Sequence, residues 1–204
     1  MYSQDQEEKF LLEHFKGTPK GRFLDIGAYD PRTLSNTRAL YERNWSGVMV
    51  EPSPKHFLNL WTEYGGDLRV VLLLAAVAVE RRFAEFYPTD GPVGTIAVGS
   101  YEKWKGETTF GPKFLVPTVT IAELVNAFGH FDFINIDAEG ISVELFFQLP
   151  LKAMVPKAVC VEHNGERLVE LGRFAQDNYY QQSWISQENA IYTPMPWLKR
   201  EQVK

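Results

Sequence analysis

The stretch FLDIGAYDPRTLSNTRALYERNWSGVMVEPSP, residues 23–54, decides how this chain is expected to fold. Two short apolar runs, over residues 22–26 and 47–50, each carry an acidic residue at or next to their end. Between them, apolar residues recur at helical spacing over residues 33–43. A strand, a helix and a second strand in this order form the unit from which parallel sheets are built.

The alternation of strands and helices continues on both sides of this stretch. Further helices are expected over residues 3–16, 53–66, 120–128, 142–148 and 166–179, and further strands over residues 68–74, 131–136 and 158–162. Residues 68–74 are apolar except for Arg69, and such a run is typical of a strand buried on both faces. Residues 181–186 and 190–192 are predicted to pair as a C-terminal antiparallel hairpin at the sheet edge. We predict a doubly wound α/β fold of Rossmann-like type, with a mostly parallel seven-stranded sheet.

The alternation breaks between residues 80 and 117. Residues 80–87 are expected to form an exposed strand, and residues 88–117 contain five glycines and four aromatic side chains. A loop of this length inside a compact domain is usually functional or disordered. We predict that residues 88–117 form a lid over the substrate in a single domain spanning residues 1–204, and the alternative is a surface insertion.

The composition is that of a globular domain with its own core. Hydrophobic residues make up 45% of the chain, charged residues 23%, and the net charge of −5 does not favour nucleic acid or an anionic membrane. The longest apolar stretch, residues 70–79, is about half as long as a membrane helix requires, and the acidic N-terminus is unlike a signal peptide. Cys160 is the single cysteine, so no disulfide framework is expected and a reducing, cytoplasmic location fits.

Acidic residues recur where the predicted strands end. Asp25, Glu51, Asp137 and Glu162 each lie at or just beyond the carboxyl end of a different strand. In an open α/β sheet, ligands bind outside these ends, where the strand order reverses. Any one of the four side chains could instead cap a helix, but all four together predict a binding crevice.

The first strand and its turn favour a nucleoside ligand over a dinucleotide. The turn contains Gly27 alone, without the further glycines that bring backbone N–H groups close to a pyrophosphate. Glu51 follows Asp25 by 26 residues, a position where a carboxylate can accept hydrogen bonds from both ribose hydroxyls. The alternative is that Asp25 only caps the following turn.

Four motifs in the same order resemble the FkbM family of methyltransferases. They are DIGA (residues 25–28), SNT (residues 35–37), VEPSP (residues 50–54) and INIDAEGISVELF (residues 134–146), and VCVEHN (residues 159–164) resembles a further strand end of that family. The resemblance covers about residues 20–193. Tyr29 and Pro31 depart from the commoner Asn and Gly of the first loop, and Glu144 lies one or two positions beyond the usual acidic or amide residue.

The resemblance implies a class I methyltransferase that binds S-adenosyl-L-methionine. In that reading Asp25, Gly27 and Ala28 hold the methionine end with Ser35 nearby, and the ribose lies against Glu51, Pro52 and Ser53. Ala76 and Val77 would present backbone to the adenine, and Asp137 would lie near the methyl group. The alternative for Ser35 is a helix cap.

Removing a proton from a hydroxyl acceptor requires a base, and the candidates are Asp137, Glu139 and His163. The resemblance suggests a hydroxyl on a sugar or another small metabolite as the acceptor. Asp137, Glu139 and Glu162 could instead bind a divalent metal ion, although no spacing demands one. Two other functions stay open. One is a nicotinamide-dependent oxidoreductase and the other is a non-catalytic module that binds S-adenosylmethionine.

Overall fold

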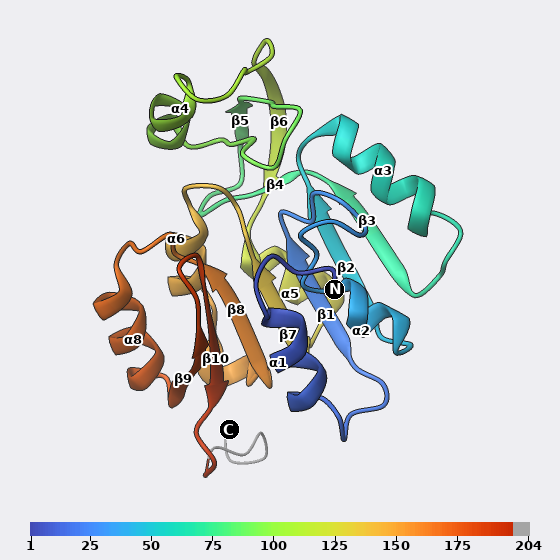
Figure 1. The fold of residues 1–204 in the computed structure, drawn as a ribbon, viewed down its shortest axis with the longest axis vertical. Helices are drawn as coiled ribbons and strands as arrows, with labels where there is room; N and C mark the ends of the chain where they lie inside the picture. The colour runs from blue at the N-terminus through green and yellow to red at the C-terminus, as the bar shows by residue number, and fades with distance from the viewer. Residues whose placement is uncertain (198–204) are drawn as a thin grey trace.

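The computed structural model describes residues 1–197 and shows the predicted doubly wound α/β fold (Figure 1). Seven strands form one sheet in the order β3-β2-β1-β7-β8-β10-β9. The strands are Arg22–Ile26 (β1), Ser46–Glu51 (β2), Val70–Leu74 (β3), Phe133–Ile136 (β7), Ala158–Glu162 (β8), Tyr180–Ile185 (β9) and Asn189–Pro194 (β10). The strands from β3 to β8 in this order are parallel, and β10 runs antiparallel to β8 and β9. The C-terminal hairpin is thus confirmed; residues 198–204 of the predicted domain lie outside the described residues.

Helices cover both faces of this sheet. They are Glu7–His14 (α1), Arg38–Glu42 (α2), Pro54–Tyr64 (α3), Ile121–Phe128 (α5), Ser142–Phe147 (α6), Leu151–Met154 (α7) and Leu168–Asp177 (α8). Leu40 and Leu60 belong to the apolar core on one face, and Leu124 and Leu171 belong to the core on the other. Helices cover the central strands of a parallel sheet on both faces, so nearly all side chains of these strands are buried. This is why the central strands are continuous apolar runs in the sequence.

The segment predicted as a long loop contains regular structure. It holds helix α4 (Val98–Trp104) and the start of β6 (Phe114–Val119), which pairs with β4 (Ala76–Val77) and β5 (Phe83–Phe86) in a second, three-stranded sheet. This sheet and α4 lie above the carboxyl ends of the main strands (Figure 1). Because these pairings join residues far apart in the sequence, the local glycine content of residues 88–117 gave no sign of them.

The prediction that residues 68–74 are buried on both faces is wrong. Strand β3 is the outermost strand of the sheet and has β2 as its one neighbour. Leu68, which precedes the strand, is fully exposed, and Leu74 is 44% exposed. An apolar run does not by itself distinguish a central strand from an edge strand.

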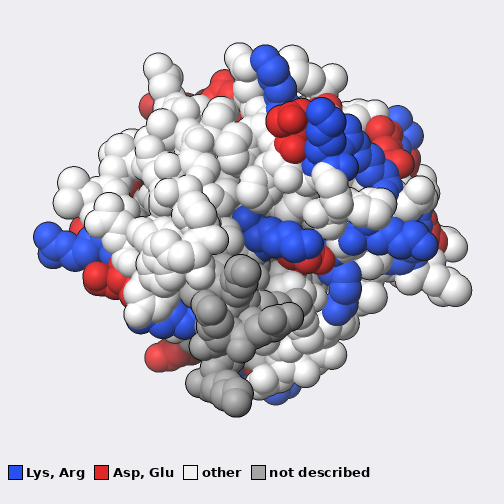
Figure 2. Space-filling view, turned by 90° about the horizontal axis from the view of Figure 1, so that it is seen from below, with Lys and Arg blue, Asp and Glu red and all other residues white. Residues whose placement is uncertain are grey.

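The helix expected over residues 33–43 is shorter, because α2 begins at Arg38 and residues 33–37 form turns. The Ser35 hydroxyl accepts the Arg38 backbone N–H at 3.1 Å just before α2, but the N-cap residue of this helix is Thr37, which makes no side-chain cap hydrogen bond. No described helix has the length and apolar character needed to cross a membrane. In the view from below, several lysine and arginine side chains lie beside acidic ones (Figure 2), as in the Arg69–Asp67 ion pair.

Candidate active site

A cavity of about 210 Å³ opens at the carboxyl ends of the parallel strands, beneath the second sheet. The residues predicted from the sequence that line it are Gly27, Glu51, Pro52, Ser53, Ala76, Val77, Asp137, Glu139 and Glu162. The predicted residues that do not line it are Asp25, Ala28, Ser35 and His163. The crevice expected from the acidic strand ends is therefore present, and most of the predicted side chains surround it.

The turn after β1 is held close to the end of β7. Gly27 has a φ of +77°, and a Cβ atom at this position would lie 1.7 Å from the carbonyl oxygen of Asp137. Only glycine fits such a conformation and so close a backbone approach. The N–H groups of Gly27 and Ala28 both donate to the Val50 carbonyl, at 2.9 and 3.2 Å. The turn is thus anchored between β2 and β7, with Gly27 facing the cavity.

Glu51 lies at the end of β2 and binds backbone on both sides of the crevice. Its two carboxylate oxygens accept the N–H groups of Tyr29, at 2.9 Å, and Ser53, at 2.8 Å. Ser53 also caps α3 by accepting the His56 N–H at 3.5 Å, and Pro54 occupies the first turn of that helix. Burial raises the pKa of Glu51 to about 7, although the two N–H groups act in the opposite direction.

Asp25 lies beneath the cavity in a buried polar network. Its carboxylate accepts the Thr37 hydroxyl at 2.5 Å and the Asn135 amide at 2.9 Å, and Asn135 in turn accepts the Asn36 amide at 3.0 Å. Burial raises the pKa of Asp25 despite these donors. The network joins β1, β7 and the residues before α2. Asn36 and Thr37 of the SNT motif therefore support the floor of the cavity beneath the Gly27 turn.

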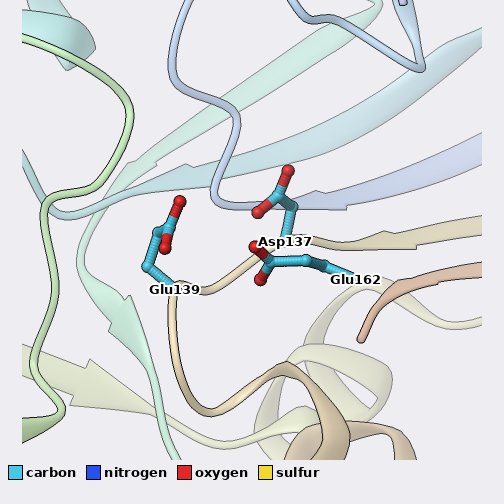
Figure 3. A group of neighbouring side chains, drawn as sticks. All are labelled: Asp137, Glu139 and Glu162. Atoms are coloured by element: carbon cyan, nitrogen blue, oxygen red, sulfur yellow. The ribbon is translucent and has the colours of Figure 1, made fainter. Parts of the chain in front are cut away.

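Three carboxyl groups converge on the other side of the cavity (Figure 3). Asp137 follows β7, Glu139 lies in the next turn with a φ of +28°, and Glu162 ends β8. One oxygen from each lies within 4.8 Å of the others. Burial and the proximity of like charges raise the pKa of Asp137, and the same causes raise that of Glu139 to about 8. Three carboxyl groups this close together either share protons or hold a cation, and three carboxylate oxygens suit a hard divalent ion.

Glu162, and not His163, accompanies Asp137. The sequence named Asp137 and His163 as candidate bases, and the strands that they follow, β7 and β8, are neighbours. The His163 side chain, however, lines a second cavity of about 370 Å³, and its Nδ1 accepts the Gly165 N–H at 2.8 Å. Side chains alternate between the two faces of a strand, so successive residues at the end of β8 point in different directions. A catalytic role for His163 stays a prediction.

Residues 88–117 rest on this site. The Thr95 hydroxyl donates to the Glu139 carbonyl at 2.6 Å, and a Cβ atom on Gly140 would lie 1.9 Å from the Ser100 Oγ. Trp104, at the end of α4, lines both cavities. The segment therefore covers the site as a lid would, in direct contact with the turn that carries Glu139.

Several side chains of the cavity were missed from the sequence. His56 lies in the first turn of α3, with its ring centroid 4.5 Å from that of Tyr29. Its Nε2 is buried without a hydrogen-bond partner. The Ser-Pro start of α3 could have indicated that His56 faces the crevice. Gln4, Glu188 and Asn189 also line the cavity, and they come from segments far away in the sequence.

The model of the FkbM methyltransferase domain matches residues 25–173, which include the Gly27 turn, Glu51 and all three clustered carboxylates. The chain belongs to the FkbM methyltransferase family. No curated protein sequence matches this FkbM methyltransferase.

Solved structures share the fold of this FkbM methyltransferase. The putative methyltransferase yhhF from Escherichia coli is similar with a TM-score of 0.51 at 10% identity, over 95% of this chain and 87% of that one. A putative RNA methyltransferase, PH1948 from Pyrococcus horikoshii, has a TM-score of 0.51 at 11% identity, over 95% and 82% of the two chains. At these identities the likeness concerns the fold alone.

Proposed function

We propose that this protein transfers a methyl group from S-adenosylmethionine to a hydroxyl on a sugar or another small metabolite. The observation that carries the proposal is the pairing of a single-glycine turn at Gly27 with the carboxylate of Glu51 on one cavity wall. Each Glu51 oxygen accepts one backbone N–H and keeps capacity to accept a second donor. Two ribose hydroxyls match that remaining capacity.

The rest of the cofactor is assigned from the same wall. Backbone at Gly27 would bind the methionine end, and Pro52 and Ser53 would flank the ribose. Ala76 and Val77 are both buried and line the cavity, which suits a flat adenine ring. Asp25, Ala28 and Ser35 lie behind this wall, and their contribution is to hold the turn and the start of α2 in place.

S-adenosylmethionine supplies an electrophilic methyl group that moves to the acceptor by in-line displacement at carbon. The chain aligns the acceptor, excludes water and takes the hydroxyl proton. Asp137 and Glu139 line the same cavity, and either group can receive this proton in its ionised form; a pKa of about 8 keeps Glu139 mostly protonated at pH 7. In a second arrangement the cluster with Glu162 holds a divalent ion that polarises the hydroxyl.

Ligand binding followed by heat denaturation tests the cofactor assignment. S-adenosylhomocysteine at a hundred times its Kd should stabilise the native state by about 2.7 kcal/mol and raise the melting temperature. NADH should have no effect, because the Gly27 turn lacks the glycines that a pyrophosphate requires. Stabilisation by NADH alone would instead support an oxidoreductase. Turnover of S-adenosylmethionine with an acceptor separates an enzyme from a binding module.

A further inference from the structure

The charge of the cavity wall is one-sided. Five carboxyl groups line it, from Glu51, Asp137, Glu139, Glu162 and Glu188, and among the described residues that line it there is no lysine or arginine. A phosphate or carboxylate group on the acceptor would enter this wall without a counter-ion. Burial and mutual repulsion already raise the pKa values of Asp137 and Glu139, and an anion beside them would raise these values further, so the wall selects against anionic acceptors.

The cofactor offsets only part of this charge. S-adenosylmethionine carries a sulfonium, an ammonium and one carboxylate, which leaves one net positive charge beside Asp137. Glu51 is used by the ribose in the proposed arrangement. Glu139, Glu162 and Glu188 then remain, and the first two lie on the side of the cavity where Trp104 and Asn164 join it to the second cavity.

The chain itself already places an ammonium group at this junction. The Lys103 Nζ lies 5.3 Å from the centroid of the Trp104 ring, and its charge lowers the pKa of Glu139 against the effect of burial. An aromatic face with a carboxylate close by is a favourable environment for a protonated amine. Lys103 is exposed and comes from the lid, so its amine can be displaced by a competing one.

One residue that lines the same cavity has a buried acceptor atom without a donor. Asn189 is 4% exposed and lines the cavity; its amide nitrogen donates to Glu7 at 2.9 Å, whereas its Oδ1 has no hydrogen-bond partner. An ammonium group has three N–H donors and no acceptor, so it matches carboxylates and an amide oxygen together. A neutral hydroxyl offers one donor.

We propose that the acceptor is an amino sugar or amino alcohol whose protonated amine binds Glu139 and Glu162 against the Trp104 ring, next to the hydroxyl that is methylated. This inference rests on the proposed function and names its substrate class. The methyl carbon–sulfur bond breaks, a carbon–oxygen bond forms, and the hydroxyl proton passes to Asp137. The amine keeps its proton throughout, because its lone pair must stay unavailable for methylation.

Three probes that share one ring test the charge preference, namely glucosamine, glucose and glucuronate. Titration calorimetry is done on protein loaded with sinefungin, a cationic analogue of S-adenosylmethionine, so that the charge of the cofactor is in place. We expect glucosamine to bind at least about tenfold more tightly than glucose, because its ammonium group makes a charge-assisted contact with the carboxylates. Glucuronate should bind weakest.

Two matched glutamate-to-glutamine variants test whether Glu139 causes the preference for glucosamine. Glu139→Gln should remove the preference for glucosamine over glucose. Glu85→Gln should keep it, because Glu85 lies on β5, is ion-paired with Lys113 and lines neither cavity. Both variants should bind sinefungin as the wild type does.

Equal binding of the three probes, or no binding of any, would overturn the amine proposal while sinefungin binding upheld the cofactor site. A preference for glucose that appears only with added Mg²⁺ would also overturn it and assign the carboxylates to a metal. Failure of sinefungin to bind would count against the methyltransferase function itself.

Discussion

Replacing Glu51 by glutamine tests the ribose contact with the least disturbance of the fold. The amide keeps the size of the side chain and one oxygen acceptor, so one of the two backbone N–H groups, of Tyr29 or Ser53, stays bonded. Alanine would leave both N–H groups without a partner and would confuse a loss of binding with a loosened turn. We expect Glu51→Gln to fold and to lose most of its affinity for S-adenosylhomocysteine.

The magnitude follows from the contacts of the carboxylate. Hydrogen bonds to an ionised group contribute about 1.5–3 kcal/mol each, so losing two ribose contacts lowers the affinity by about a hundredfold or more. The wild type should also show a pH dependence. With a pKa of about 7, only about a tenth of Glu51 is ionised at pH 6, so cofactor affinity falls by up to about tenfold from pH 8 to pH 6. The variant has no group that titrates at this position, and its affinity should stay constant over that range.

The same pKa sets how Glu51 affects stability. The carboxyl is 5% exposed, and the rise from 4.5 to about 7 means that its ionised form is disfavoured in the folded state by about 3 kcal/mol. The folded protein therefore binds this proton more tightly than the unfolded chain does, and the contribution of Glu51 to the free energy of unfolding falls as pH rises from about 4.5 to about 7. Urea unfolding of wild type and Glu51→Gln at pH 5 and pH 8 measures the difference.

Titration calorimetry at pH 6, 7 and 8 provides the affinities, and circular dichroism confirms the fold. Glu85→Gln is the control, since its carboxylate lies outside the cavity. If folded Glu51→Gln binds S-adenosylhomocysteine as tightly as the wild type at pH 8, the ribose assignment is refuted.

Three further predictions concern the acceptor side. His163→Ala should lower turnover about a hundredfold with near-normal S-adenosylhomocysteine affinity if this histidine is the base, and unchanged turnover would return it to a structural role. Gly140→Ala should displace α4, because Gly140 has a φ of +89° and the new Cβ would overlap the Ser100 side chain. The KM for the acceptor should rise, and the affinity for the cofactor should stay unchanged. An unaltered KM would contradict the proposed lid contact. Hydrogen exchange of residues 90–112 should be fast in the free protein and slow with acceptor bound; initial protection equal to that of Phe133–Ile136 would argue against a moving lid.

The wall that we propose for the cofactor could be located from the sequence because its information is local. Asp25, Gly27, Glu51 and Asp137 lie within a few residues of apolar strands, and parallel strands bring their carboxyl ends to one edge whatever the intervening helices contain. No separate prediction of the strand order was needed, because β1 lies between β2 and β7 and the ends of these three strands are therefore neighbours. What the sequence could not indicate was that Asp25 faces the Thr37 and Asn135 side chains beneath the floor rather than the cavity.

The proposed acceptor half depends on contacts between distant parts of the chain. The sequence named Glu162 as a possible metal ligand and His163 as a candidate base, but it could not indicate that Glu162 lines the cavity while His163 does not. Strand β10 lies between β8 and β9, so the turn that carries Glu188 and Asn189 comes to the crevice from the C-terminal hairpin. Asn189 is fixed there by Glu7, 182 residues earlier in the chain. These distant segments and residues 88–117 therefore shape the proposed acceptor side of the cavity separately from the Gly27 turn and Glu51. The charge preference for the acceptor can be inferred only from the assembled cavity wall, because no single sequence motif encodes it.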